Sequence, residues 1–306
     1  MDIELRECSL ADGSDILDML REIGPGENGF MNDGYDLQPL EFRDFLFKNI
    51  NSSRGIDIAV PLVPSTRYWL FVDGSPAGYA KLRHYLNAGF RKIGGHIGYC
   101  IRPSARGKGY GCILLGEMLK KAAEMKIPRV LVTCLETNTA SRKVAEHNGG
   151  KLEGIADGEC YYWIGLDESA GMREIHPDDY TEIVELWRNT PGMGMSRTDS
   201  EEGITSFLLR NKSFSFCWKE EDKIIATLLC GHDGRRGYIY HVMTAPEFRG
   251  RGIALKLTEK CLQRLKEAGI DKCHLFVFAD NEPGNTFWSS TGWIKRDDIL
   301  LYSRNT

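Results

Sequence analysis

Apolar and polar residues follow strand and helix periodicities along this chain, and the segments occur in the same order in each half. A strand-like run opens each half, and a pattern with apolar residues three or four positions apart follows it, as in an amphipathic helix. In the first half these segments are residues 3–6 and 14–23, and in the second they are residues 172–175 and 178–188. Each half then becomes irregular.

Two adjacent apolar runs come next and predict a β-hairpin in each half. In the first half residues 68–72 and 77–86 flank Asp73-Gly74, a dipeptide that suits a tight turn. In the second half the runs are residues 214–218 and 224–230, joined by charged residues.

The later part of each half predicts a strand, a glycine-rich turn, a helix and a buried strand. The strands before the turns are residues 96–102 and 238–244, and those after the helices are residues 130–135 and 274–278. A last strand is expected at residues 161–166 of the first half. The apolar stripes expected on the two helices comprise Leu114, Leu115, Met118, Leu119 and Ala122, and Leu257, Cys261, Leu262, Leu265 and Ala268.

The glycine-rich turns read Arg106-Gly107-Lys108-Gly109-Tyr110-Gly111 and Arg249-Gly250-Arg251-Gly252-Ile253-Ala254. Ten identical pairs recur at an offset of 143 residues, from Pro103 and Pro246 to Gly149 and Gly292. Solenoid repeats are much shorter than this, at about 20 to 50 residues. We therefore predict a duplicated α/β domain, with one copy at residues 1–166, the other at 172–306, and a polar linker at 167–171.

Composition limits the cellular compartment and the binding partners that we expect. A formal net charge of -4 and a pI near 6.0 provide no basic field, so nucleic-acid binding is disfavoured. The nine cysteines are odd in number and lack C-x-x-C spacing, which argues against a disulfide framework or a metal site. The acidic start and the lack of an 18-residue apolar run favour a cytoplasmic protein that is not embedded in a membrane.

A glycine-rich turn between a strand and a helix directs backbone N–H groups and the positive end of the helix dipole at one point. Such a site stabilises an anion, and a diphosphate fits it well. The spacing of these glycines matches neither a Walker A loop nor a Rossmann fingerprint. Nucleotide hydrolysis and hydride transfer therefore lose support.

The turns resemble the signature R/Q-x-x-G-x-G/A of the GNAT superfamily of acetyl-CoA-dependent N-acetyltransferases. Arg106, Gly109 and Gly111 match it in the first half, and Arg249, Gly252 and Ala254 match it in the second. Asn138 and Asn281 also stand eleven residues ahead of a glycine, as in that family. The resemblance is strongest over residues 60–166 and 172–300, and it implies two tandem GNAT-like acyl-CoA N-acyltransferase domains with mixed sheets.

By the same resemblance, the backbone amides of residues 107–111 and 250–254 would hold the pyrophosphate of acetyl-CoA. The strand ends at Ile101 and Thr244 would pair with the pantetheine arm. Lys108 and Arg251 would add charge beside the phosphates or remain solvated loop cations. Asn138 and Asn281 would reach the pantetheine region or cap the helices that follow them. The cofactor-binding candidates are thus Ile101, Arg106, Gly107, Lys108, Gly109, Tyr110, Gly111, Asn138, Thr244, Arg249, Gly250, Arg251, Gly252, Ile253, Ala254 and Asn281.

Many relatives carry a tyrosine seven residues after the asparagine, where it protonates the departing thiol. This chain has Ala145 and Trp288 at those positions, and neither side chain can act as that acid. A thiol of pKa about 8.5 can leave without protonation, so a slow or differently assisted enzyme remains open. Tyr99, Tyr161, Tyr162 and Tyr240 are substitute acids or structural residues.

Histidine suits the general base, and His96 and His241 lie on the strand before each turn. Regular strand alternation would place both on one face, although a bulge would break that parity. Each is a candidate catalytic base or a hydrogen-bonded strand histidine. Because His241 lies close to its glycine-rich turn, we favour the second half as the catalytically active one.

The irregular segments at residues 24–37 and 190–200 differ between the halves and are expected to form the acceptor sites or to pack on the surface. Their dissimilarity predicts that the halves do not share one acceptor. The favoured function is acetyl transfer to the amine of a small molecule or peptide, by a monomer or homodimer. The alternative is a CoA-binding tandem module with one or both domains non-catalytic.

Overall fold

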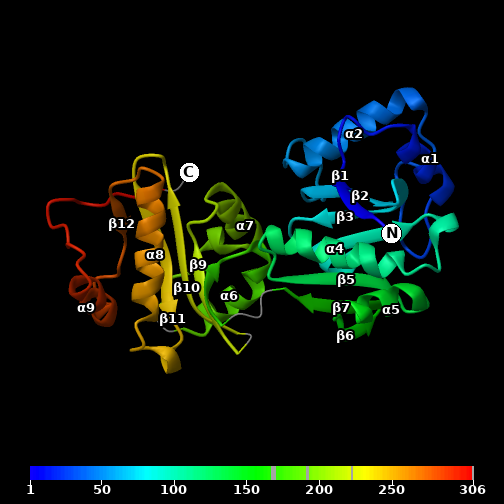
Figure 1. The fold of residues 1–306 in the computed structure, drawn as a ribbon. Helices are drawn as coiled ribbons and strands as arrows, with labels where there is room; N and C mark the ends of the chain where they lie inside the picture. The colour runs from blue at the N-terminus through cyan, green and yellow to red at the C-terminus, as the bar shows by residue number, and fades with distance from the viewer. Residues whose placement is uncertain (167–169, 191–192, 222, 305–306) are drawn as a thin grey trace. The chain divides into compact units, whose positions relative to one another are not determined.

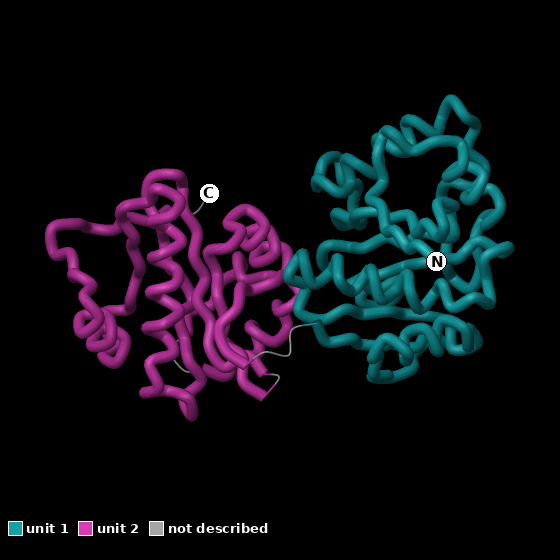
Figure 2. Tube along the Cα trace, in the orientation of Figure 1, with its two compact units in different colours: residues 1–168 teal, residues 169–306 magenta. Residues whose placement is uncertain are grey.

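The computed structural model describes residues 1–166, 170–190, 193–221 and 223–304. The chain divides into two compact units, residues 1–168 and 169–306 (Figure 2). Most of the expected linker, residues 167–169, lies outside the described residues, and Gly171 is the first residue of a strand in unit 2.

Unit 1 contains two antiparallel sheets, and helices lie between some of their strands along the chain (Figure 1). Strand order is β1-β2-β3-β4 in one sheet and β5-β7-β6 in the other. Its elements are β1 Ile3–Glu7, α1 Ser14–Ile23, α2 Pro39–Ser53, β2 Ser65–Val72, β3 Ser75–Arg83, α3 Ala88–Lys92, β4 Ile97–Ile101, η1 Pro103–Ala105, α4 Tyr110–Glu124, β5 Arg129–Leu135, α5 Thr139–His147, β6 Lys151–Ala156 and β7 Glu159–Gly165.

The four-stranded sheet of unit 1 is covered on both faces because its strands alternate between two apolar cores. Leu70 and Leu82 join the core beneath α4, to which Leu114 and Met118 contribute. Trp69 belongs to the other core, with apolar side chains of α1 and α2.

Unit 2 is built around one five-stranded sheet with strand order β12-β11-β10-β9-β8. Among the strands of the described residues in unit 2, β11 and β12 pair in parallel and the other neighbours pair antiparallel. Its elements are β8 Gly171–Glu174, η2 Pro177–Asp179, α6 Tyr180–Arg188, η3 Arg197–Asp199, α7 Glu201–Arg210, β9 Phe216–Glu220, β10 Lys223–His232, β11 Gly237–Thr244, η4 Pro246–Phe248, α8 Ile253–Glu267, β12 Cys273–Leu275 and α9 Glu282–Ser290.

The sheet of unit 2 also carries one core on each face. Leu257, Cys261 and Leu265 of α8 are buried against one face. Trp187 of α6 lies in the core on the other face, together with apolar side chains of α7. Leu262 and Ala268, which the periodicity placed on the buried stripe of α8, are exposed. The stripe is narrower than predicted because α8 meets the sheet along one line of side chains.

Several elements match the sequence predictions closely. Helix α1 spans the expected residues, and Asp73-Gly74 joins β2 to β3. The expected strand at residues 274–278 is wrong in its length, because β12 ends at Leu275. Helices α2 and α7 were missed, although Ser200 caps α7 through the Gly203 N–H, a recognisable start signal.

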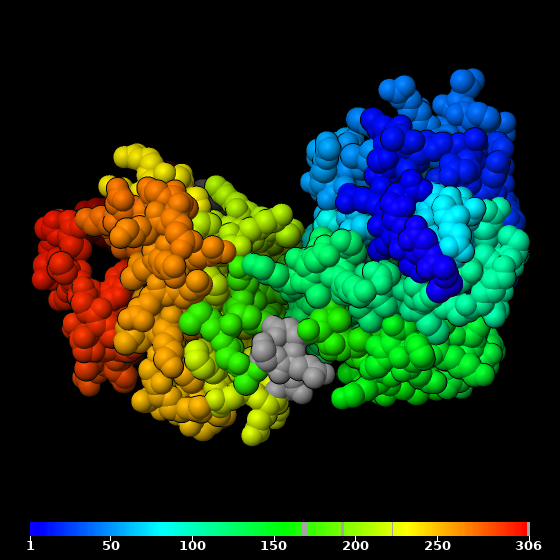
Figure 3. Space-filling view, in the orientation of Figure 1, coloured from blue at the N-terminus to red at the C-terminus, as the bar shows by residue number. Residues whose placement is uncertain are grey.

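The segment from α9 to residue 304 lies at the surface of unit 2 (Figure 3, red). Ile294, Leu300 and Leu301 are all at least 70% exposed there. The longest helices of the described residues have 15 residues, and none of those helices has both the length and the apolar character that a bilayer crossing requires.

Candidate active site

A left-handed glycine starts the helix after each glycine-rich turn. Gly109 has φ 81° and Gly252 has φ 72°, and each is the residue before the first helical position, at Tyr110 and Ile253. A Cβ atom at either glycine would meet nothing within 4 Å. Glycine is therefore needed for the backbone conformation, and the space above each turn is open.

The backbone N–H groups of the two turns are unused within the described residues. Those of residues 107–111 make no hydrogen bond there, and neither do those of residues 250–254. Each set precedes or begins a 15-residue helix, whose N-terminus adds positive potential. Five consecutive free donors at a helix N-terminus fit a pyrophosphate, so the residues of both turns suit that part of CoA.

The first arginine of each glycine-rich turn hydrogen-bonds to the end of the strand that precedes the turn. Arg106 donates from Nε to the Ile101 carbonyl at 3.0 Å, and Arg249 donates from Nε to the Thr244 carbonyl at the same distance. Each guanidinium thus ties the turn to the end of the preceding strand. That Arg106 and Arg249 take part in cofactor binding stays a prediction.

The second cation of each turn differs between the units. Arg251 makes a bidentate pair with Glu220 at 2.6 and 2.9 Å. Lys108 is exposed and lies 3.5 Å from the Ser104 carbonyl. Only Lys108 is therefore left to add its charge to a bound anion without breaking an ion pair.

The strand that leads into each turn separates from its neighbour. In unit 1, β4 and β5 belong to different sheets and meet at His96, whose backbone N–H donates to the Leu131 carbonyl at 2.7 Å. In unit 2, β11 pairs with β12 only as far as Ile239, and β11 then continues to Thr244. Near Ile101 and Thr244 the described strands leave an edge on which an extended ligand arm could lie, and the pairing of pantetheine there stays a prediction.

Asn138 and Asn281 are helix caps. The Oδ1 atom of Asn138 accepts from the Ser141 N–H at 3.1 Å, and that of Asn281 accepts from the Gly284 N–H at 3.0 Å. The capping alternative thus has direct geometric support in both units. A contact with pantetheine through the remaining Nδ2 stays a prediction.

His96 is buried and bound to backbone. Its side chain is fully buried, and its Nδ1 accepts from the Leu131 N–H at 2.9 Å. The ring therefore replaces a strand hydrogen bond where β4 and β5 begin to diverge. This geometry favours the structural alternative for His96.

His241 lies at a β-bulge in β11. The register passes from Thr227 opposite Met243 to Leu229 opposite Tyr240, so two residues of β11 face one of β10. His241 has φ 48°, a left-handed conformation that costs a non-glycine residue about 1 to 3 kcal/mol. The expected shared face of His96 and His241 is wrong, because His96 precedes β4 and the bulge turns His241 out of alternation.

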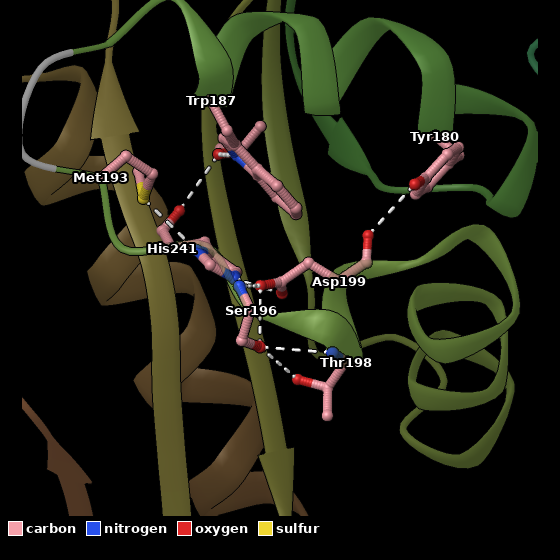
Figure 4. Close-up of polar contacts among 8 residues, drawn as sticks. Tyr180, Trp187, Met193, Ser196, Thr198, Asp199 and His241 are labelled. Carbon is pink, nitrogen blue, oxygen red and sulfur yellow. Dashed lines mark hydrogen bonds and ion pairs between the residues drawn. The ribbon is translucent and has the colours of Figure 1, made fainter.

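Three side chains from other parts of unit 2 contact the His241 ring (Figure 4). Nε2 lies 2.7 Å from Asp199 Oδ1, and Nδ1 lies 3.3 Å from Met193 Sδ. Trp187 stacks on the ring with centroids 4.2 Å apart. Thr227 links this group to the backbone, because it accepts from Trp187 Nε1 and donates to the His241 carbonyl. Pro191 and Gly192, in the expected acceptor loop, lie outside the described residues.

Asp199 and Trp187 were missed at the sequence level. Ser196-x-x-Asp199 is a capping-box pattern, and it would have placed Asp199 at a helical start beside the irregular loop. Its contact with His241 joins residues 42 positions apart, which no local pattern predicts.

Unit 1 has a different arrangement at the place of His241. The 143-residue offset aligns His241 with Gly98, and a Cβ atom at Gly98 would lie 3.7 Å from the Phe30 ring. Opposite Gly98 on β3 stands Lys81, which lies 3.7 Å from Asp33. Burial, then the charge of Arg67, lowers the pKa of Lys81 to about 8. The histidine and its aspartate are thus features of unit 2.

Three of the four tyrosines suggested as substitute acids have hydrogen-bond partners of their own. Tyr99 Oη lies 2.9 Å from Ser141 Oγ, Tyr161 donates to the Lys92 carbonyl, and Tyr162 donates to Glu146. Tyr240 is 41% exposed on β11. Burial raises the pKa of Tyr99, Tyr162 and Tyr240. Ala145 is buried in the unit 1 core, which leaves that position without an acid.

Comparison with known proteins matches each unit separately. Residues 171–293 match the Acetyltransferase (GNAT) family, and residues 35–151 match an Acetyltransferase (GNAT) domain. Acetyltransferase SG1711 of Sodalis glossinidius is 26% identical over 133 residues, which cover 44% of this chain and 93% of that protein.

Acetyltransferase plu1384 of Photorhabdus laumondii is 31% identical over 115 residues, covering 36% of this chain and 77% of that protein. A solved structure of the paia N-acetyltransferase from Thermoplasma acidophilum in complex with coenzyme A matches with TM-score 0.39 and 18% identity, over 43% of this chain and 93% of that one. The chain belongs to the GNAT family of acetyltransferases, with one GNAT domain in each unit.

Proposed function

We propose that the chain is an acetyl-CoA-dependent N-acetyltransferase that acts on the amine of a small molecule or peptide by direct transfer. We further propose that both glycine-rich turns hold CoA and that transfer takes place in unit 2. The observation that carries the proposal is the set of five N–H donors at residues 250–254 that are unused within the described residues, in the turn and first helical positions that follow the strand of His241.

When bound, acetyl-CoA supplies an acetyl thioester to the site. The amides of residues 250–254 would hold the pyrophosphate, and the free edge of β11 would align the arm beside His241. His241 takes a proton from the acceptor amine, which must be neutral to attack. Positioning of two reactants can gain effective molarities of about 10⁵ to 10⁸ M, so aligned binding supplies much of the rate. With Trp288 at the position of the usual tyrosine, the sulfur would leave as a thiolate without protonation by a tyrosine acid.

The test of this proposal is thiol release from acetyl-CoA across a panel of small amines and peptides, with the full-length chain. His241→Gln is expected to lower kcat/KM by about 10² to 10⁴, the usual contribution of a positioned base. His232→Gln, at the far end of β10, serves as the matched control and should stay within twofold. Turnover that survives in His241→Gln would remove His241 from the mechanism.

A second candidate function applies to unit 1, which would bind CoA without turnover. Its turn has the same free donors, but Gly98 stands where unit 2 has His241 and Phe30 lies beside it. Thiol release that persists in Gly252→Asp and disappears in Gly109→Asp would contradict this assignment. CoA binding by the parent chain with no thiol release from any amine would favour a binding module in both units.

A further inference from the structure

The hydrogen bonds around His241 determine which ring nitrogen is available. We propose that Asp199 is a positioning residue that holds His241 as the Nε2–H tautomer, so that Nδ1 is the atom that receives the amine proton. This inference rests on the function proposed for unit 2, and it adds the atom and its supporting residue to that proposal.

Asp199 can only accept from the ring. An ionised carboxylate has no proton to donate, so the 2.7 Å contact between Asp199 Oδ1 and His241 Nε2 requires a proton on Nε2. Oδ2 of the same carboxylate accepts from the Ser196 N–H at 2.6 Å and from Ser196 Oγ at 3.2 Å. Tyr180 donates to the Asp199 carbonyl at 3.1 Å. The carboxylate is therefore held in place on both oxygens.

The plane of the imidazole is fixed from a second direction. Trp187 is 1% exposed and stacks on the ring at an angle of 22°. The Trp187 indole donates to Thr227 Oγ1 at 2.8 Å, and Thr227 donates to the His241 carbonyl at 3.1 Å. Ring and backbone of His241 are thus locked by one buried chain of contacts, which explains how a left-handed histidine persists in β11.

Among the residues that the structure describes, Nδ1 of His241 has no strong hydrogen-bond partner. It faces the thioether of Met193 at 3.3 Å, and a thioether has no proton to donate. The Nδ1 lone pair is therefore unclaimed in the neutral ring. An amine whose proton is taken must come within about 2.6 to 3.2 Å of this atom, so Met193 Sδ stands where the acceptor nitrogen has to enter.

In the acetyl transfer, the Nε2–H tautomer of His241 determines where the proton of the amine goes. The amine nitrogen forms a bond to the acetyl carbon, the bond from that carbon to sulfur breaks, and the proton of the amine passes to Nδ1. The ring is then an imidazolium with both nitrogens protonated, and the Asp199 carboxylate stabilises its charge through Nε2–H. The electron pair of the broken bond leaves with the thiolate, which later takes up the proton.

Asp199→Asn tests the inference because asparagine keeps the shape but can donate to Nε2. The ring would then carry its proton on Nδ1 and lose the basic lone pair. We expect kcat to fall by about 10² to 10⁴, by comparison with the loss of about 10⁴ for the same change in a serine-protease triad, while the Kd for CoA stays within threefold. Asp233→Asn, in the exposed turn after β10, is the matched control and should keep its activity.

Nitrogen-15 spectra of histidine-labelled protein read the tautomer without any assay of turnover. The parent should show His241 as Nε2–H, and Asp199→Asn should move it to Nδ1–H with an unchanged melting temperature. Active parent protein with His241 in the Nδ1–H form would overturn the inference. An Nε2–H ring in a chain that turns over no amine would instead contradict the proposed function.

Met193→Ala provides a second readout that a merely structural loop would not give. Since the thioether must leave Nδ1 before the amine enters, this variant should lower KM for the amine while kcat stays within threefold. It should leave the Nε2–H tautomer unchanged. A kcat loss as large as that of Asp199→Asn would place Met193 in a different role and contradict the entry path.

Discussion

Glu22 of α1 links the helical face of unit 1 to the turn that precedes its glycine loop. Its Oε1 accepts from the Ser104 N–H at 2.7 Å, and its Oε2 accepts from Arg102 Nε at 2.6 Å. Burial alone would raise the pKa of Glu22, but the Ser104 hydrogen bond and the Arg102 guanidinium outweigh it and lower the pKa from 4.5 to about 2. The ionised form is thus favoured by the folded state.

This shift predicts an acid-sensitive contribution to the stability of unit 1. Because the folded pKa is the lower one, the contribution is complete above the unfolded value of 4.5 and is lost as the pH falls from there through about 2. Urea unfolding should show Glu22→Gln less stable than the parent at pH 7, with a smaller difference at pH 3. Glu117→Gln, whose carboxylate pairs with Lys120 on the surface of α4, should differ little at either pH. An equal deficit of Glu22→Gln at both pH values would refute the linkage.

At the level of the element, the asparagine caps begin α5 and α9 in the same way. Asn138→Ala should cost unit 1 about 1 kcal/mol, the usual loss when a capping oxygen is removed. Asn138→Asp keeps the oxygen that accepts from Ser141 N–H and should keep both the stability and the CoA affinity within threefold. The measurement is denaturant unfolding together with CoA titration. A large loss of CoA affinity in a stable Asn138→Asp protein would show that the side chain has a ligand role beyond capping.

Elements with a strong local signal were predictable from the sequence, and those set by tertiary packing were not. Helix α1 and the Asp73-Gly74 turn matched because periodicity and turn chemistry determine them locally. Helix α2 was missed because its apolar residues Phe42, Phe45 and Leu46 follow a long irregular stretch. The β11 bulge could not be located, since its position depends on how β11 pairs with β10.

Across the whole molecule, the duplication predicts the parts that hold CoA better than the parts that would act on it. Helices α4 and α8 begin at residues 110 and 253, and α5 and α9 begin at residues 139 and 282, each pair at the same 143-residue offset. The segments between the first two helices of each unit have diverged. One places Phe30 near Gly98, and the other brings Met193 and Asp199 to His241. Residues from such loops are fixed by contacts distant in sequence, so the His241 partners could not be predicted.

Because both turns keep the same glycines and the same free N–H donors among the described residues, we predict two CoA sites per chain. Calorimetric titration of the full-length parent should therefore give two molecules of CoA bound. Gly109→Asp should bind one and Gly252→Asp should bind one, because a carboxylate repels the pyrophosphate and the left-handed φ strains any side chain there.

The double variant should bind none, and Gly234→Asp, a positive-φ glycine in an open turn of unit 2, should still bind two. That control separates the effect of the added charge and strain from the effect of their location. Full stoichiometry in either single variant would exclude that turn as a CoA site. If only Gly252→Asp also loses thiol release, the two sites have the same ligand but only the one beside His241 transfers from it.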